Sequence, residues 1–395
     1  MKKITMVAIG AACLSMIFAV SCGSGKNYAT GLKMVNVAGG EYESPNYSWF
    51  YSDQHDWTTA TQIHSTNEMK KVTISDFQIA TTETTYATWY DVLKWATDEA
   101  RGDKRYRFEN NGREGMAEAI GTKPGKNKNH PVGAIGWETA IVWCNALSEK
   151  NGLEPVYYFE GNVLRNEKTL YDYNIKVESQ ALSKAMIDLK NTLTNEAIVN
   201  IAKKGIPLYE KLSIDETKNG FRLPTVYEWM YAARGGKPGS YDWDLNYAGS
   251  DNASEVGWFG EECGWDSSND CWNDLLSKYG NKDVAKKKKN ALGLYDMTGN
   301  VDEWTNTLYH ECYVDGSWAE IKLDAYIAGG AWVHFADSDE AKLTVSNEKG
   351  LFDELHSSVR PSYKLTFRLN DYCYDYLRNK RSSIGFRVAR TLTKK

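Results

Sequence analysis

NALGLYDMTGNVDEWTNT, residues 290–307, brings glycines, asparagines, acids and a tryptophan together within a short span. Gly, Asn and Asp weaken strands and favour turns, so an ordinary buried strand does not account for this composition. The stretch therefore predicts a loop whose backbone turns sharply several times. Its role depends on what surrounds it in the chain.

Composition indicates a soluble, well-packed globule. Of the 395 residues 13% are aromatic, which favours a packed domain over a disordered or fibrous chain. This length allows one to three domains. The net charge is −5, and the one long basic run, residues 285–290 (AKKKKN), reads as a solvated loop. These features argue against nucleic acid as a partner.

The first residues indicate export. Residues 1–21 read as a signal peptide, because two lysines precede an apolar segment too short for a membrane span. Small residues before Cys22 resemble a bacterial lipoprotein box, in which this cysteine is acylated; cleavage by ordinary signal peptidase is the alternative. Residues 22–32 then form a flexible tether. We expect a protein lipid-anchored to the bacterial outer membrane or cell surface.

The cysteines that would remain in the mature chain do not all pair. They are Cys144, Cys263, Cys271, Cys312 and Cys373. Cys263 and Cys271 flank a short loop and form either a disulfide or two free thiols. No group of Cys and His has the spacing of a zinc site.

Hydrophobic periodicity predicts a strand and two helices in the first half. Residues 72–79 (VTISDFQI) alternate as a strand does, and residues 86–96 (YATWYDVLKWA) change to helical spacing. A second helix is predicted in residues 136–152, where Asn151-Gly152 supplies a left-handed stop. Its buried face would contain Ala140, Trp143, Cys144 and Leu147. Cys144 is therefore expected in the core and not as a nucleophile.

Residues 219–236 predict an extended run followed by a third helix. Thr225 and Glu228 have the spacing of a capping box, and Gly235-Gly236 ends the helix. The preceding residues 180–204 predict surface helices within an insertion. Beyond residue 234 periodicity is weak until a short strand in residues 382–391 (SSIGFRVART). This pattern favours an α+β fold with a small antiparallel sheet.

Eight sequence blocks occur in a characteristic order. They are GGEY (39–42), TTETTYATWYDVLKWA (81–96), PVGAIGWETAIVWCNALSEKNG (131–152), NGFRLPTVYEWMYAARGG (219–236), YAGSDNASEVGWF (247–259), NALGLYDMTGNVDEW (290–304), IAGGAWV (327–333) and IGFRVAR (384–390). The set resembles the formylglycine-generating enzyme family, also called the sulfatase-modifying-factor family. Insertions near residues 160–215, 260–288 and 336–366 have no counterpart in that family.

The resemblance implies one domain, residues 33–395, with the loop-rich formylglycine-generating-enzyme variant of the C-type lectin-like fold. This fold is α+β, with small antiparallel sheets and a few helices, and calcium ions hold its loops. In the family the Gly-Asn-x-x-Glu segment is a calcium site. Carried over, Asn300 and Glu303 would give side-chain oxygens and Val301 its carbonyl oxygen, which are the ligands that calcium takes. Asp302 either adds a ligand or faces water.

A second calcium site of the family would fall on the block at residues 247–259. It would use Asn252 and the carbonyl of Ala253, with Asp266 as the acid of the following loop. For both loops the alternative is a network of Asn and Asp hydrogen bonds without metal.

Catalytic members of the family oxidise a sulfatase cysteine to formylglycine with two cysteines that bind copper(I), a metal that prefers thiolates. Those cysteines follow a Gly-Gly-Ser segment, which corresponds to Gly329-Gly330 here. Counting onward without gaps puts His334 and Asp339 at the two positions. Cys373 is the nearest downstream cysteine and has no partner close in sequence. We therefore expect no copper site.

The sequence favours a non-catalytic, lipid-anchored binding or structural module for a protein or glycan ligand. Aromatic and polar residues near the corresponding face would form the ligand surface, or would pack against an inserted loop: Trp332, His334, Phe335, Asn370, Tyr372, Tyr374, Tyr376 and Arg378. Tyrosine offers a large contact area at low entropic cost. The alternatives are an oxidoreductase with altered metal chemistry and a scaffold lipoprotein of a gliding or secretion complex.

Overall fold

The computed structural model describes the family blocks almost throughout. The described residues are 28, 31–45, 49–52, 63–64, 69–115, 119–170, 172–173, 210–259, 280–315, 318–331, 359–361 and 383–392.

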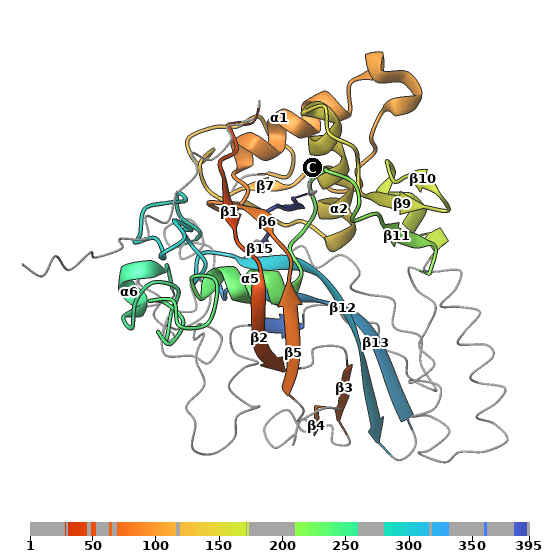
Figure 1. Cartoon of the computed structure of the whole chain (residues 1–395). Coiled ribbons are helices and arrows are strands. Elements are labelled where there is room, and N and C mark those ends of the chain that lie inside the picture. The colour runs from red at the N-terminus through yellow and green to blue at the C-terminus, as the bar shows by residue number, and fades with distance from the viewer. Residues whose placement is uncertain are drawn as a thin grey trace, which may run out of the picture.

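The described chain is a set of small sheets with a few helices around them (Figure 1). The strands are β1 (Met34–Val37), β2 (Gly40–Pro45), β3 (Trp49–Ser52), β4 (Ile63–His64), β5 (Met69–Ile74), β6 (Phe77–Ala80), β7 (Arg113–Glu114), β8 (Val132–Gly133), β9 (Tyr157–Phe159), β10 (Asn162–Val163), β11 (Leu212–Ile214), β12 (Asp302–Asp315), β13 (Trp318–Ala328), β14 (Val359–Pro361), β15 (Ile384–Gly385) and β16 (Ala389–Thr391). The helices are α1 (Tyr86–Ala96), the 3-10 helix η1 (Glu99–Lys104), α2 (Trp137–Lys150), α5 (Val226–Ala233) and α6 (Ala253–Val256). The α+β expectation is confirmed.

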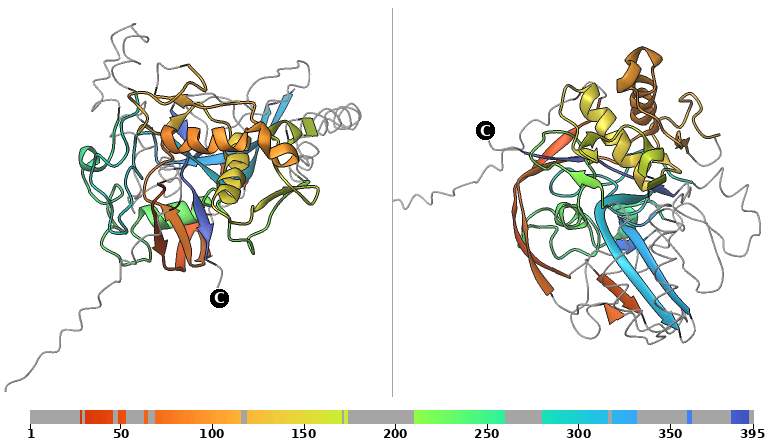
Figure 2. Two further views of the ribbon diagram at one scale, coloured as in Figure 1. Left: turned by 90° about the horizontal axis from the view of Figure 1, so that it is seen from above. Right: turned by 90° about the vertical axis from the view of Figure 1, so that its right-hand side faces the viewer.

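The largest sheet is built on a long hairpin of β12 and β13. Its strand order is β14-β13-β12-β3-β4, and β15 also pairs with β12. The contacts of β12 with β3 and β15 are parallel, so this sheet is mixed, while the smaller sheets are antiparallel. The right-hand view of Figure 2 shows the hairpin extending away from the helices. Weak periodicity after residue 234 gave no warning of these strands.

The three helices that the sequence predicts within the described residues, α1, α2 and α5, begin and end close to the predicted positions, whereas η1 and α6 were not predicted. Thr85 caps α1, and its side chain accepts a hydrogen bond from the Thr88 N–H at 3.3 Å. Thr225 and Glu228 form the predicted capping box of α5. Helix α2 stops at Asn151 and Gly152, which has φ 68°. Local signals suffice here because each cap involves neighbours in the chain.

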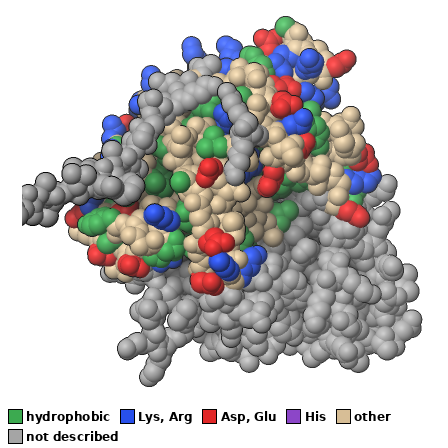
Figure 3. Space-filling model, in the orientation of Figure 1, with side chains coloured by type: hydrophobic (Ala, Val, Ile, Leu, Met, Phe, Trp, Pro, Cys, Tyr) green, Lys and Arg blue, Asp and Glu red, His purple; other side chains and the backbone are tan. Residues whose placement is uncertain are grey.

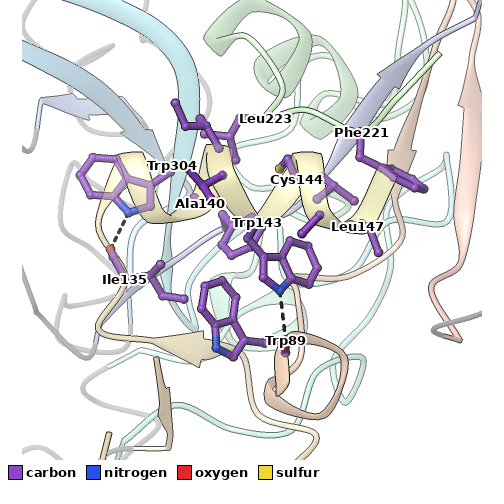
Figure 4. Close-up of a cluster of buried hydrophobic side chains, with 14 of the residues drawn as sticks. Trp89, Ile135, Ala140, Trp143, Cys144, Leu147, Phe221, Leu223 and Trp304 are labelled. Carbon is purple, nitrogen blue, oxygen red and sulfur yellow. Dashed lines mark hydrogen bonds between the residues drawn. The ribbon is translucent and has the colours of Figure 1, made fainter. Parts of the chain in front are cut away.

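The core is centred on α2, which is buried on all sides from Trp137 to Ser148. Trp143 stacks on Trp89 of α1 with ring centroids 5.4 Å apart, and its indole N–H donates to the Trp89 carbonyl oxygen at 3.2 Å (Figure 4). Cys144 is 0% exposed, and burial raises the pKa of its thiol. Its predicted place in the core is confirmed.

Two predicted boundaries differ from the structure. Residues 72–79 are not one strand: β5 pairs with β2, whereas β6 lies between β1 and β16. The expected tether also contributes to the fold, because Tyr28 and Leu32 are buried in the core, and the Tyr28 hydroxyl donates to Gln78 at 3.1 Å. The core thus includes Tyr28, within the expected tether.

The insertions lie partly outside the described residues. The two ends of the 160–215 stretch return to one sheet, where β10 and β11 flank β9. The helices predicted at residues 180–204, the pair Cys263 and Cys271, and the signal peptide with Cys22 fall outside the described residues.

Candidate functional site

The quoted stretch forms a chain of left-handed turns before it enters β12. Gly293, Asp296, Gly299 and Asn300 have φ of 83°, 54°, 76° and 66°. Glycine, asparagine and aspartate tolerate this region better than other residues do. At Gly299 a Cβ would also lie 2.7 Å from the carbonyl oxygen of Trp258. These constraints account for the composition of the stretch.

A buried ion pair stands where the turns meet β12. Glu303 and Arg387 are both 0% exposed. The Arg387 Nε donates to Glu303 Oε2 at 2.6 Å, and Nη2 donates to Oε1 at 2.6 Å. The Trp229 indole N–H also donates to Oε2, at 2.8 Å. Each carboxylate oxygen is therefore hydrogen-bonded, as a buried charge requires.

The remaining donors of Arg387 bind the backbone around it. They reach the carbonyl oxygens of Ala80 at 3.3 Å, Tyr295 at 3.0 Å and Asp296 at 3.1 Å. One guanidinium thus connects the segment between β15 and β16 to the end of β6, to the turn loop and to β12.

Two further buried acids surround this pair. Glu83 accepts hydrogen bonds from the Asn300 side-chain amide at 2.7 Å and from the Val301 N–H at 3.1 Å. Burial, together with the negative charges of Asp296 and Glu303, raises the pKa of Glu83 well above its ordinary value. Among the described residues, three buried carboxyl groups share one buried guanidinium. The cluster therefore favours an additional proton or cation.

Asp296 has a carboxylate oxygen without a hydrogen-bond partner among the described residues. Its Oδ2 accepts from the Ala285 N–H at 2.7 Å, whereas the buried Oδ1 accepts from no group. Burial raises the pKa of Asp296 to about 6, and the charge of Glu303 adds to this effect. An orphaned buried carboxylate oxygen suits either a proton or a cation that prefers oxygen ligands.

The residues predicted for the first calcium site lie together but are already hydrogen-bonded within the protein. Asn300 Oδ1 accepts from the Lys282 N–H at 2.9 Å, and both oxygens of Glu303 bind Arg387. Val301 and Asp302, the first residue of β12, are also buried, so Asp302 does not face water. Among the described residues no three His, Cys, Asp or Glu side chains are grouped to hold a metal. Calcium at this site stays a prediction.

Sequence reasoning missed Asp296, Glu83 and Arg387. The first lies within the quoted stretch, four residues before Asn300, and the other two lie in other family blocks. The only sign in the sequence that these three residues lie close together is that their blocks belong to one family. No spacing rule joins Arg387 to Glu303, 84 positions away, or Glu83 to Asn300, 217 positions away.

The second predicted site has the local geometry of a helix cap. Asn252 Oδ1 accepts from the Ser254 N–H at 3.1 Å at the start of α6, and the Ala253 carbonyl oxygen accepts from the Gly257 N–H at 2.9 Å. Asp266 lies outside the described residues. So does the whole predicted ligand surface: Trp332, His334, Phe335, Asn370, Tyr372, Tyr374, Tyr376 and Arg378.

The fold and the site define a loop-rich α+β domain whose turn loops are fastened by a buried ion pair. The chain belongs to the family of the sulfatase-modifying factor enzyme 1-like domain, whose family model matches residues 23–392. The resemblance drawn from the eight blocks is thereby confirmed.

Relatives within this family include catalysts and non-catalysts. The chain is 29% identical over 324 residues to the chaperone protein LppX of Paenibacillus barcinonensis, covering 81% of this chain and 85% of that protein. It is 38% identical over 93 residues to the formylglycine-generating enzyme of Mycobacterium tuberculosis, covering 23% and 28%. It is 33% identical over 119 residues to the inactive Cα-formylglycine-generating enzyme 2 of Mus musculus, covering 30% and 33%.

A solved structure shares the fold. The crystal structure of CarF aligns with a TM-score of 0.53 at 23% identity, over 92% of this chain and 99% of that one. A likeness at this identity supports the architecture alone.

Arg387→Met should lower the free energy of unfolding by about 3 to 5 kcal/mol, because it leaves Glu303 charged and unpaired in the interior. Urea unfolding of the variant beside wild type measures this change. Lys71→Met breaks the exposed Lys71–Glu41 pair, whose side chains are 62% and 52% exposed, and should leave the free energy of unfolding close to that of wild type, because water already screens this pair. Equal losses in the two variants would contradict a central role for the buried pair.

The raised pKa of Asp296 predicts a pH dependence in calcium-free buffer. Between about 3.8 and about 6 the folded state binds this proton more tightly than the unfolded state, so stability falls as pH rises through that window. Asp296→Asn keeps an oxygen for the Ala285 N–H and removes the titration. It should be more stable than wild type at pH 7 by up to about 3 kcal/mol, and nearly equal to it at pH 4.

Urea unfolding in EDTA at the two pH values tests this expectation. Asp103→Asn, in exposed η1, serves as the matched control and should follow wild type at both. A stability difference between Asp296→Asn and wild type that is the same at pH 4 and pH 7 would show that Asp296 does not titrate in this window.

Proposed function

We propose that the chain is a non-catalytic, calcium-stabilised binding module of its family, held at the bacterial envelope through Cys22. The observation that carries the non-catalytic part is the run after Gly329-Gly330. There His334 and Asp339 stand where catalytic members have the cysteines that bind copper(I). Neither side chain supplies a thiolate.

The Gly329-Gly330 segment, which precedes the positions of the family's copper-binding cysteines, is packed against the turn loop and α5. The carbonyl oxygen of Gly329 accepts from the Gly299 N–H at 2.8 Å, which joins the Gly-Gly segment to the turn loop. Gly329 and Gly330 have φ of 96° and 70°, and a Cβ on Gly329 would lie 3.2 Å from the Trp229 ring. The scaffold is therefore the same, while the cysteine pair of the catalytic members is replaced.

A polypeptide is the ligand class that the relatives favour. A relative that matches 81% of this chain is named a chaperone protein, and a chaperone binds other proteins. The tyrosine-rich sequence of the predicted ligand surface agrees in composition with surfaces that contact proteins. We therefore propose an exported protein as the ligand, ahead of a glycan.

Membrane attachment in this proposal rests on the lipoprotein-like sequence before Cys22. No helix in the described part of the chain has the length and apolar character of a membrane span. Tyr28 is buried in the core of the domain, so only a few residues separate the domain from Cys22.

Calcium would enter this proposal at the buried acid cluster. The unpartnered Oδ1 of Asp296 would give such a cation one oxygen ligand, and the excess of carboxyl groups over guanidinium would favour its charge. Bound calcium would neutralise that excess and keep the turn loop closed. Asp296 thus joins Asn300, Val301 and Glu303 as a proposed contributor.

A direct test of the absence of catalysis uses the purified protein with copper(I), oxygen and a Cys-x-Pro-x-Arg peptide. The mass of the peptide should stay unchanged, while a cysteine-containing homologue run in parallel converts it to the aldehyde. Conversion by this chain would overturn the non-catalytic assignment. The next variant would then be Cys373→Ser, because Cys373 is the nearest cysteine downstream of the Gly-Gly segment.

Calcium should raise the melting temperature of wild type by about 2 to 5 °C at millimolar concentration, since a ligand that binds only the folded state stabilises it. Asp296→Asn should lose this shift, and Asp103→Asn should keep it. Differential scanning calorimetry in calcium and in EDTA measures both. If the melting temperature of wild type does not change with calcium, calcium is removed from the proposal. The hydrogen-bond network would then be the sole support of the loop.

A further inference from the structure

Two lysine-rich segments far apart in the sequence lie side by side in the fold. Residues 122–130 read TKPGKNKNH and residues 282–289 read KDVAKKKK. The Val284 N–H donates to the Asn129 carbonyl oxygen at 3.1 Å, and His130 Nε2 lies 3.7 Å from the Asp283 carboxylate. Together they form a lysine patch of Lys123, Lys126, Lys128, Lys282, Lys286, Lys287, Lys288 and Lys289.

Acidic partners within the described chain neutralise only part of this patch. The two segments contain one acid, Asp283, which lies 3.6 Å from Lys286; the neighbouring Glu255 lies 3.5 Å from Lys288. Four exposed members form no ion pair with described residues: Lys123, Lys126, Lys128 and Lys289. In a chain of net charge −5 such a concentration of unpaired lysines creates a local positive field that attracts anions.

The segment at 122–130 is held rigidly beneath its lysines. The buried Glu114 accepts from the N–H groups of Gly125 at 2.5 Å and Asn127 at 2.6 Å. The carbonyl oxygen of Lys128 accepts from the Ala87 N–H of α1 at 2.9 Å. These lysines therefore project from a preformed loop.

The second segment is held equally well. The Ala285 N–H binds Asp296, and the Lys288 N–H donates to the Glu255 carbonyl oxygen at 2.8 Å. The Lys287 ammonium lies 4.1 Å from the centroid of the Trp258 ring. The backbone of both segments is thus fixed before any partner binds, which lowers the entropic cost of binding.

The patch lies close to where the chain enters the domain. The Thr81 N–H donates to the Lys33 carbonyl oxygen at 2.9 Å, and the Tyr295 N–H donates to the Thr81 carbonyl oxygen at 2.9 Å. The next residue, Asp296, binds the Ala285 N–H of the lysine segment. A chain anchored at Cys22 would be fixed only a few residues before Tyr28, within roughly 20 Å of extended chain. The lysines therefore fall within reach of the bilayer.

We propose that this lysine patch docks on an anionic phospholipid surface and orients the domain on the membrane that anchors it. The inference rests on the lipid anchor of the proposed function. The two segments contain lysines but no aromatic residue, whereas protein interfaces are centred on buried aromatic and arginine anchors. Exposed lysines without such anchors suit anionic lipid headgroups, because these attract basic segments by their charge. Figure 3 shows Lys and Arg side chains along the upper left margin of the molecule.

The test measures co-sedimentation of the unlipidated chain, residues 22–395 with Cys22→Ser, with vesicles. This chain retains every described residue. It should sediment with vesicles of 70% phosphatidylcholine and 30% phosphatidylglycerol but not with pure phosphatidylcholine, and 0.5 M salt should release it. Because no lipid anchor is present, the result is independent of whether Cys22 is acylated, which mass spectrometry of the exported protein decides separately.

Two triple variants locate the binding surface. Lys123→Gln with Lys126→Gln and Lys128→Gln, and Lys286→Gln with Lys288→Gln and Lys289→Gln, should each weaken binding at least about tenfold, because each lysine near an anionic surface contributes to the attraction. The control removes the same charge elsewhere, with Lys71→Gln, Lys104→Gln and Lys168→Gln, and should bind within about threefold of wild type. Melting temperatures verify that all variants fold.

Three results would overturn the proposal. Equal binding to vesicles with and without phosphatidylglycerol would exclude headgroup charge as the attraction. Equal loss in the patch and control variants would show that net charge alone matters. Failure to bind vesicles, with retention on a poly-glutamate column through the same lysines, would assign the patch to an acidic protein instead.

Discussion

The fold depends on one buried charge placed between distant parts of the chain. Arg387 pairs with Glu303 at the start of β12 and also binds carbonyl oxygens at the end of β6 and in the turn loop. Since an unpaired guanidinium or carboxylate inside the protein is costly, the three segments can hold their places only together. Two side chains therefore couple the start of β12, the end of β6, the 290–303 loop and the segment between β15 and β16.

The same coupling gathers buried acids from separate segments at one place in the fold. Left-handed residues such as Asp296 and Asn300 bring side-chain oxygens into the same buried region as Glu83. The resulting surplus of acid over base is tolerable only with a bound proton or cation, which links the stability of the loop to its ionic surroundings. The same loop is joined to the Gly-Gly segment by the hydrogen bond from the Gly299 N–H to the Gly329 carbonyl oxygen. A family can thus keep the scaffold and change the chemistry beyond Ala331.

Local signals anticipated the helices well and the sheets poorly. Helices α1 and α2 and the capping box of α5 were readable because their caps and buried faces involve residues three or four positions apart. The β12–β13 hairpin and the division of residues 72–79 between two sheets were not, since strand pairing depends on partners elsewhere in the chain. The bulge between Trp304 and Leu308 further obscures the period of the hairpin.

The sequence by itself determined the family, the turn-rich character of residues 290–303 and the candidate ligands Asn300 and Glu303, because those properties are carried by short ordered blocks. Only the tertiary structure decided which side chains surround them. Arg387, the unpartnered oxygen of Asp296 and the union of two lysine segments come from residues dozens to hundreds of positions apart. A lysine run that reads as a solvated loop in one dimension becomes half of a larger patch in three, because folding adds charges that spacing along the chain does not reveal.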